Sequence, residues 1–403
     1  MRIAAVGCSH GGFDDIYKAI HRMDSESKRR GQLPVELLIC CGDFQAIRCN
    51  ADLYTMKAPP KFRLLRDFHN YYAGRKKAPI LTLVIGGNHE AMSYMWESYH
   101  GGWLAPNIYF LGYAGCVLVD GWLRIAGCSG IYKAEDWRKG HFERIPFTPS
   151  TLVSGYHTRQ YDVARLMQVD IFMSHDWPRA IERQGDTQAL LREMPRFQID
   201  SNTLGSPAHE ILLKTLKPAR WCAGHMHVRF TAEIRHDKLQ PPQSQTTKFL
   251  ALDKPGEGRD FLEVIDVPTP EAHLPPKDTR HHTPTLFFDP HWLAIVRAFA
   301  PFLPLTEKAV GLPPAEQHPH LIADALAWVQ ENVGVKAVDD VQVFAQTAPP
   351  TRSSGGEEDT GIMRAYLRFY RPFPRPYSNP QTQAFCDMLG IPNQIDYANP
   401  SPG

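Results

Sequence analysis

Side chains that bind metal ions or transfer protons recur in this sequence where a short apolar run breaks into a turn. A run of Val, Ile and Leu without strict alternation is typical of a strand that is buried on both faces. In chain order, the side chains at these run ends are Cys8, His10, Asp43, Asn88, His89, His175, His225 and His227. Because the carboxyl ends of parallel strands lie along one edge of a sheet, we expect these groups to converge.

The converging groups would supply imidazoles, a carboxylate, an amide oxygen and a thiolate, which are enough donors for two metal ions with a shared ligand. Taken singly they indicate little, because a lone histidine after a strand is usually a hydrogen-bonded loop residue and Cys8 alone would be core filler. Several such ends in one chain argue against coincidence. Gly42, Gly87 and Gly224 stand beside them and would let the backbone turn sharply and the substrate approach.

The elements that must position these groups alternate between strand-like and helix-like over the first two thirds of the chain. A helix is predicted after the first strand because apolar residues recur there with helical spacing, at Phe13, Ile16, Tyr17, Ile20 and Met23. Asp120-Gly121 lies between two apolar runs and predicts a hairpin. The predicted fold is an α/β sandwich of mixed sheets flanked by helices.

The length of 403 residues favours one large and one smaller domain. We predict a catalytic domain over 1–267 with an insertion at 129–165, a Pro- and His-rich linker over 268–285, and a smaller, mainly helical C-terminal domain over 286–403. Helices are predicted there over 291–302 and 314–332.

Composition limits the partners and the compartment. The net charge of +1 provides no bulk field toward nucleic acid or membrane, so a polyanion would need a local patch. None of the eight cysteines forms a CxxC pair, which favours a reducing compartment. The N-terminus does not have the pattern of a signal peptide, and no run is long enough to span a bilayer. We expect an intracellular protein without a membrane partner.

The order of the motifs resembles a known family. The chain contains C-S-H, GD, GNHE, SHD and GHMH in sequence, and D-x-H, GD, GNH[DE], a single His and GHxH mark the calcineurin-like metallophosphoesterases. Cys8 takes the place of the first aspartate. A cysteine at this position, together with CGDFQAIRC, SGIY, SHDWP and GHMH, is similar to the RNA lariat debranching enzymes.

This resemblance implies two divalent metal ions bridged by Asp43. One ion would take Cys8, His10, Asp43 and His227, and the other Asp43, Asn88, His175 and His225. Because a thiolate is a soft ligand, the Cys8 pocket should prefer Zn²⁺ or Fe²⁺ to Mg²⁺ or Ca²⁺. We expect Mn²⁺ to support activity as well.

The resemblance also implies the reaction. The substrate would be branched intron lariat RNA, whose 2′–5′ phosphodiester bond is hydrolysed to give linear RNA for turnover. We expect a hydroxide formed between the two ions to attack phosphorus and His89 to protonate the leaving oxygen as general acid. In the alternative interpretation, His89 only hydrogen-bonds the phosphate or its own loop.

The insertion at 129–165 interleaves aromatic rings with cations, which are the ingredients of single-stranded RNA recognition. In the debranching family this region is a lariat-recognition loop. The candidate contacts are Tyr132, Lys133, Trp137, Arg138, Lys139, Phe142, Arg144 and Tyr156. The alternative is an amphipathic insertion whose aromatics pack on the sheet. A similar segment at 366–377 is better explained as a tail held across the main domain.

Other functions fit the sequence less well. A protein phosphatase-like phosphomonoesterase would carry Asp-Arg-Gly after its GD motif, whereas Asp43 is followed here by Phe44 and Gln45. A non-catalytic scaffold would have lost ligands, yet each ligand position holds a candidate. A general nuclease or cyclic nucleotide phosphodiesterase on the same scaffold is not excluded by the motifs. The lariat substrate implies a nuclear location, with shuttling to the cytoplasm, and splicing or intron-turnover factors as partners.

Overall fold

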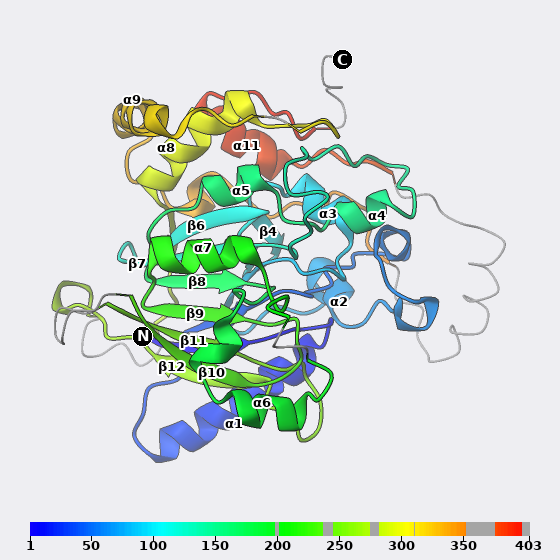
Figure 1. Cartoon of the computed structure of the whole chain (residues 1–403), viewed down its shortest axis with the longest axis vertical. Helices are drawn as coiled ribbons and strands as arrows, with labels where there is room; N and C mark the ends of the chain where they lie inside the picture. Colours follow the sequence, from blue (N-terminus) through cyan, green and yellow to red (C-terminus); the bar gives the residue numbers. More distant parts are fainter. Residues whose placement is uncertain (198–200, 237–244, 275–281, 310, 352–374, 397–403) are drawn as a thin grey trace.

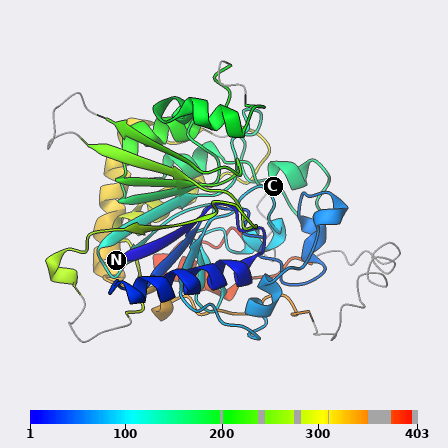
Figure 2. The same ribbon diagram turned by 90° about the horizontal axis from the view of Figure 1, so that it is seen from below.

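Two mixed β-sheets stack face to face in the computed structural model, which describes residues 1–197, 201–236, 245–274, 282–309, 311–351 and 375–396 (Figures 1 and 2). The first sheet has the strand order β12-β1-β2-β3-β5-β4, and the second has the order β10-β11-β9-β8-β7-β6-β13. The sandwich of mixed sheets predicted from the sequence is confirmed.

The central strands of each sheet are parallel, and the strands at the sheet margins are antiparallel. The first sheet comprises β1 (Arg2–Val6), β2 (Leu37–Cys40), β3 (Leu81–Val84), β4 (Gly102–Ala105), β5 (Ile108–Phe110) and β12 (Leu262–Asp266). The second sheet comprises β6 (Ala114–Val119), β7 (Leu123–Cys128), β8 (Ile171–Ser174), β9 (Arg220–Ala223), β10 (Phe230–Arg235), β11 (Thr246–Ala251) and β13 (Leu286–Phe288).

Helices cover the outer faces of the two sheets. The α-helices are α1 (Phe13–Arg29), α2 (Phe68–Tyr72), α3 (Met92–Glu97), α4 (Thr151–Ser154), α5 (Gln160–Ala164), α6 (Thr187–Glu193), α7 (Pro207–Leu216), α8 (Pro290–Phe299), α9 (His318–Asn332) and α11 (Pro380–Leu389). Short 3₁₀ turns are η1 (Asp52–Thr55), η2 (Pro60–Phe62), η3 (Ile181–Gln184), η4 (Glu271–His273), η5 (Ala300–Phe302), η6 (Ala315–Gln317) and η7 (Val338–Asp340). Among the described residues, no helix is both long enough and apolar enough to cross a bilayer.

The core divides along the faces of the first sheet. In β1, Ile3 and Ala5 belong to the cluster between the sheets, whereas Ala4 and Val6 belong to the cluster under α1. This alternation follows from the two-residue period of a strand, and because both faces are buried, all four residues are apolar. The strand therefore starts as a continuous apolar run and ends at the sheet edge, where its polar successors begin.

The C-terminal residues pack as a helical layer at one end of the sandwich, where α8, α9 and α11 gather (Figure 1). The predicted helices over 291–302 and 314–332 correspond to α8 and α9, each of which begins or ends within a few residues of the predicted bounds. In addition, β13 pairs antiparallel with β6, so this region also completes the second sheet. Most of the segment 366–377 lies outside the described residues.

The predicted hairpin is confirmed. Asp120 and Gly121 have φ of 52° and 72° and connect β6 to β7, which pair antiparallel from Val119–Leu123 onward. Two consecutive residues with positive φ are the requirement of a type I′ turn, which explains the Asp-Gly pair.

Candidate metal centre

Asp43 lies between two groups of candidate ligands. Its Oδ2 atom is 3.6 Å from Nε2 of His10, and its Oδ1 atom is 3.4 Å from Nε2 of His175. The side chain follows β2 and is 1 % exposed. One carboxylate oxygen therefore faces each group, which is the arrangement that a shared ligand requires.

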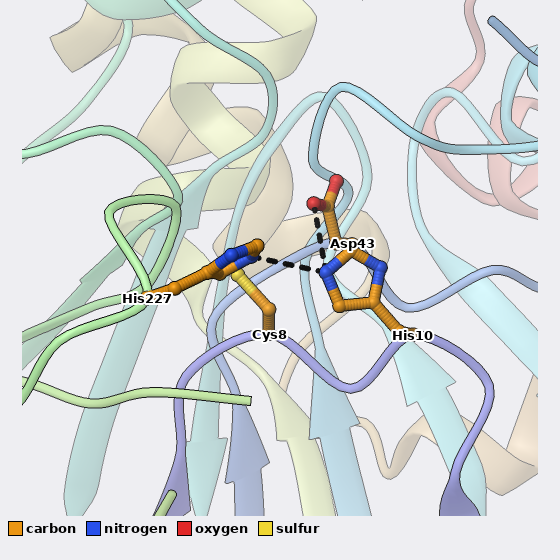
Figure 3. A group of neighbouring side chains, drawn as sticks. All are labelled: Cys8, His10, Asp43 and His227. Carbon is orange, nitrogen blue, oxygen red and sulfur yellow. Dashed lines mark hydrogen bonds and ion pairs between the residues drawn. The ribbon is translucent and has the colours of Figure 1, made fainter. Parts of the chain in front are cut away.

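The first group consists of Cys8, His10, Asp43 and His227, which converge from three different loops (Figure 3). One donor atom from each of the four lies within 4.8 Å of the other three. The Nε2 atoms of His10 and His227 are 3.1 Å apart, and Cys8 is fully buried with its Sγ 3.0 Å from the backbone nitrogen of His225. A thiol, two imidazoles and a carboxylate at this spacing could hold one metal ion.

The second group lies on the other side of Asp43. Nε2 of His175 is 3.0 Å from Oδ1 of Asn88, and the opposite ring nitrogen, Nδ1, donates to the carbonyl oxygen of Cys41 at 2.9 Å. That hydrogen bond fixes the tautomer and leaves the Nε2 lone pair for a ligand bond. The ring of His225 packs on His175 with centroids 4.9 Å apart.

The backbone bends sharply at the candidate ligands. His10, Asp43, His225 and His227 have φ of 44°, 44°, 67° and 55°, in the left-handed region that costs an L-residue about 1 kcal/mol. Neighbouring glycines are required for close approach: a Cβ on Gly42 would lie 2.3 Å from Nδ1 of His175. Turns of this kind direct side chains from neighbouring strand ends toward one point.

The electrostatics of the site suit cation binding. Burial opposes ionisation of Asp43, but the adjacent histidines, led by His175 and His10, hold its pKa well below the ordinary value. Burial lowers the pKa of His175 to about 4 and that of His227 to about 3, so both rings are neutral near pH 7. Burial, followed by the charge of Asp43, raises the pKa of the Cys8 thiol, so a compensating cation is needed to hold the thiolate.

His89 stands apart from the ligand groups. Its backbone nitrogen donates to Oδ1 of Asp43 at 2.9 Å, and its side-chain Nδ1 donates to the carbonyl oxygen of Lys57 at 2.8 Å. The ring centroid is 5.9 Å from that of His10. With Nδ1 used in this way, Nε2 is the nitrogen left to exchange a proton with a substrate.

Two residues of the site have no predicted role. Gln45 places its amide nitrogen 3.1 Å from Nδ1 of His10. Glu90 accepts hydrogen bonds from the backbone nitrogens of Phe44, Gln45 and Gly87 at 2.6, 2.7 and 3.0 Å, and thereby joins the loop after β2 to the loop after β3. Gln45 lies in the motif GDFQA and Glu90 in the motif GNHE, which also contain Asp43 and Asn88. Their closeness in sequence to these candidate ligands is the signal that could have indicated a role in the site.

Buried polar contacts within the insertion at 129–165 hold it in one conformation. His157 contacts Asp136 at 2.6 Å, and Arg159 contacts Glu143 at 2.6 Å. The backbone nitrogen of Gly130 donates to the carbonyl oxygen of Gly86 at 3.0 Å, and that of Tyr132 donates to Oδ2 of Asp176 at 3.3 Å, beside the loops that carry Asn88 and His175. The insertion therefore borders the centre as a fixed wall.

The predicted RNA contacts in this insertion divide into two kinds. The rings of Tyr132 and Trp137 lie 5.6 Å apart, and Lys133 and Arg138 are exposed, although Lys133 also pairs with Glu135 at 3.4 Å. By contrast, Lys139 pairs with Asp136 and Glu307 and lies 5.6 Å from the ring of Phe142. Arg144 lies over Trp96 and donates to the carbonyl oxygens of His141 and Glu143. The contacts of Lys139 and Arg144 are thus largely intramolecular.

Comparison with known proteins relates this geometry to two family models. The model "Calcineurin-like phosphoesterase" matches residues 1–229, and the model "Lariat debranching enzyme, C-terminal domain" matches residues 244–394. The chain is 40% identical to "Lariat debranching enzyme" of Arabidopsis thaliana over 98% of this chain and 88% of that protein. It is 41% identical to "Lariat debranching enzyme" of Homo sapiens, over 97% of this chain and 69% of that protein.

Proposed function

The chain belongs to the lariat debranching enzymes, and from this premise we propose that it hydrolyses the 2′–5′ phosphodiester bond of branched intron RNA at the centre built around Asp43. It is a hydrolase that acts on branched RNA, with a calcineurin-like phosphoesterase domain and a C-terminal domain of its own family. The observation that supports the assignment of the site is the division of the Asp43 carboxylate, which offers one oxygen to each ligand group.

The phosphoesterase family implies divalent metal ions, and the donors present fit them: neutral imidazoles, an ionised carboxylate and a buried thiol. In our proposal Cys8, His10, Asp43 and His227 hold one ion, and Asp43, Asn88, His175 and His225 hold the other. Such ions supply charge neutralisation at the phosphate and acidify bound water. The thiol favours Zn²⁺ or Fe²⁺ in its pocket, with Mn²⁺ able to replace them.

The chain's own contribution to bond cleavage is assigned to His89. As general acid the ring would have to carry both protons: Nδ1–H stays on the Lys57 carbonyl, and Nε2–H passes to the departing 2′-oxygen of the branch nucleotide, which leaves the ring neutral. In this proposal the Lys57 carbonyl holds the orientation of the His89 ring, and His89 is not a metal ligand. The fixed wall formed by the insertion at 129–165 would hold the nucleotides around the branch.

A cleavage assay on one branched RNA with a single 2′–5′ bond among 3′–5′ bonds tests the proposal. Metal-stripped protein is reloaded separately with Zn²⁺, Fe²⁺ and Mn²⁺, and a linear RNA of the same sequence is the control substrate. We expect cutting only at the 2′–5′ bond, with Zn²⁺ or Fe²⁺ most effective. Equal cutting of the linear RNA would establish a general nuclease instead.

We also propose that the protein works in the nucleus and meets splicing or intron-turnover factors there. The support is the substrate, since introns are excised in that compartment. Microscopy of the fluorescently tagged full chain checks the location, and a uniformly cytoplasmic signal would contradict it.

A further inference from the structure

A basic, partly apolar segment lies beside the candidate centre, and the proposed mechanism uses none of its side chains. From Leu53 to Arg66 the sequence has no acidic residue and four cations: Lys57, Lys61, Arg63 and Arg66. The whole chain carries a net charge of only +1, so this local concentration is not a consequence of overall composition. A concentrated positive surface of this kind attracts a polyanion.

Both ends of this segment contact residues of the centre. At one end, the Lys57 carbonyl accepts the hydrogen bond from Nδ1 of His89 at 2.8 Å. At the other end, the backbone nitrogen of Asp67 donates to the carbonyl oxygen of Gly11 at 3.2 Å, directly after His10. The segment therefore spans the rim of the centre from His89 to His10.

A small core of its own holds the segment in one conformation. Ile47, Leu53, Met56, Ala58 and Ala91 form a separate buried cluster on which Leu65 packs. In addition, Nε of Arg63 donates to the carbonyl oxygen of Ala58 at 2.8 Å. These contacts fix the backbone of the segment.

The outward side chains combine apolar surface with unpaired charge. Phe62 is 55% exposed and Leu64 is 41% exposed, and Nζ of Lys61 lies 4.9 Å from the Phe62 ring centroid. Within the described part of the chain, none of the four cations forms an ion pair. An exposed aromatic ring between cations is the pattern that binds single-stranded nucleic acid, because bases stack on the ring and phosphates meet the charges.

We propose that the part of this segment that carries the four cations, Lys57–Arg66, binds a single-stranded arm of the RNA substrate as the arm leaves the branch point. A base stacks on Phe62, and the adjoining phosphates contact Lys61 and Arg63. This inference rests on the proposed function, since it takes branched RNA to be the substrate. It adds a second RNA surface, separate from the insertion at 129–165, and makes the length of the arms a determinant of affinity.

Two branched RNAs test the proposal, one with a single nucleotide on each arm and one with arms of about ten nucleotides, near the size of a single-strand site. The readout is the ratio of kcat/KM between the long and the minimal substrate. Phe62→Leu removes the ring but keeps apolar volume, and we expect the ratio to fall about tenfold. Phe62→Trp keeps a stacking surface and should restore the ratio. Lys61→Glu should lower the ratio and its dependence on salt.

Lys28→Glu is the matched charge control. Lys28 is exposed near the end of α1, about 25 Å along the helix from the centre. We expect this variant to keep the wild-type ratio. The melting temperature of each variant is measured first, and only variants that melt at the wild-type temperature are compared, so that loss of folding is not mistaken for loss of binding.

Several results would overturn the proposal. A wild-type protein that prefers neither substrate has no arm site, and an unchanged ratio in Phe62→Leu removes the stacking contact. An equal loss on both substrates would assign the segment to the centre itself, and tight binding of an acidic protein in place of RNA would make it a protein-docking surface. Fluorescence anisotropy with linear RNA reads arm binding separately, so failure of the wild type to cut any branched RNA would contradict the proposed function alone.

Discussion

The side-chain amide of Gln45 lies 3.1 Å from Nδ1 of His10, on the opposite side of the ring from Nε2, which faces His227 and Asp43. A histidine that gives its Nε2 lone pair to a metal ion carries its hydrogen on Nδ1. In the structure the amide nitrogen of Gln45 is the atom that faces Nδ1, so with a metal ion on Nε2 a half-turn of the amide would place its oxygen to accept the Nδ1 hydrogen. We therefore propose that Gln45 is a positioning residue for the His10 ring, which it contacts at Nδ1.

Removing this acceptor should weaken metal binding. Gln45→Leu is expected to lower metal affinity about 10- to 100-fold, the usual effect of losing an outer partner of a ligating histidine. Gln45→Glu retains an acceptor and should remain closer to the wild type. Competition with a chelator measures both affinities, and a wild-type affinity in Gln45→Leu would show that His10 is oriented by its loop alone.

Glu90 should couple stability to activity. Glu90→Gln replaces one acceptor oxygen with a donor that faces backbone N–H groups, so a buried hydrogen bond is lost at a cost of about 1–3 kcal/mol. We expect a lower free energy of unfolding and a lower kcat, because the loops that carry Asp43 and Asn88 separate. Urea unfolding and steady-state kinetics check this. Wild-type stability in Glu90→Gln would mean that the two loops are held together by other contacts.

His89→Ala separates proton transfer from metal binding. If His89 is the general acid, kcat should fall about 10²- to 10⁴-fold while bound metal, measured by elemental analysis, stays at the wild-type level. His225→Ala serves as the comparison, because loss of a ligand should reduce metal content together with rate. Parallel loss of metal in His89→Ala would move this residue into the ligand set.

Cys8→Asp tests the source of metal preference. The residue is fully buried and the two side chains are similar in size, so the change is mainly from a soft donor to a hard one. Activity should shift from Zn²⁺ or Fe²⁺ toward Mn²⁺ and Mg²⁺. The measurement is the relative rate after reloading with each ion, and an unchanged order would remove the thiolate as the cause of the preference.

His100 makes stability depend on pH where the C-terminal helical layer contacts the first sheet. Its ring stacks on Phe385 of α11 at 5.3 Å. Burial lowers the pKa of His100 to about 3, the nearby charge of Arg165 acts in the same direction, and Asp162 opposes them. Because the unfolded pKa is about 6.5, the unfolded state binds the proton more readily between these values. The contribution of His100 is complete above pH 6.5 and is lost as the pH falls toward 3.

The comparison of wild type with His100→Phe isolates this contribution. Over pH 5–6.5 the wild type should lose up to about 1.4 kcal/mol per pH unit more than the variant. Urea unfolding at several pH values gives the free energy of unfolding of each protein. In the difference between the two proteins, the contributions of the other buried histidines cancel. Identical slopes would show that the ring is hydrated in the folded state.

The sequence predicts the parts of this protein that follow from local pattern. Apolar runs predicted the strands, and the Asp120-Gly121 pair predicted the hairpin, because turn chemistry is a property of adjacent residues. The convergence of Cys8, His10, Asp43 and His227 was expected from the sheet rule, and the structure brings these four together. Their ligand roles remain predictions.

Contacts between distant segments could not be predicted in this way. Arg48 is fully buried and contacts Glu97 at 2.8 Å and the hydroxyl of Thr347 at 2.6 Å, which links the loop after β2 to the C-terminal region. Neither spacing nor composition indicates such a partner. The contact of Gln45 with His10 depends in the same way on how two loops meet.

The pairing of β13 with β6 also has a consequence for how the protein is made. The ribosome delivers β6 long before β13, and at about 5–20 residues per second the interval is on the order of 10–30 s. Throughout that time the nascent chain carries a bare sheet margin with unpaired amide and carbonyl groups, which is a template for wrong pairing. Synthesis of this enzyme therefore includes a waiting period during which a chaperone, or slow release from the tunnel, has the most to protect.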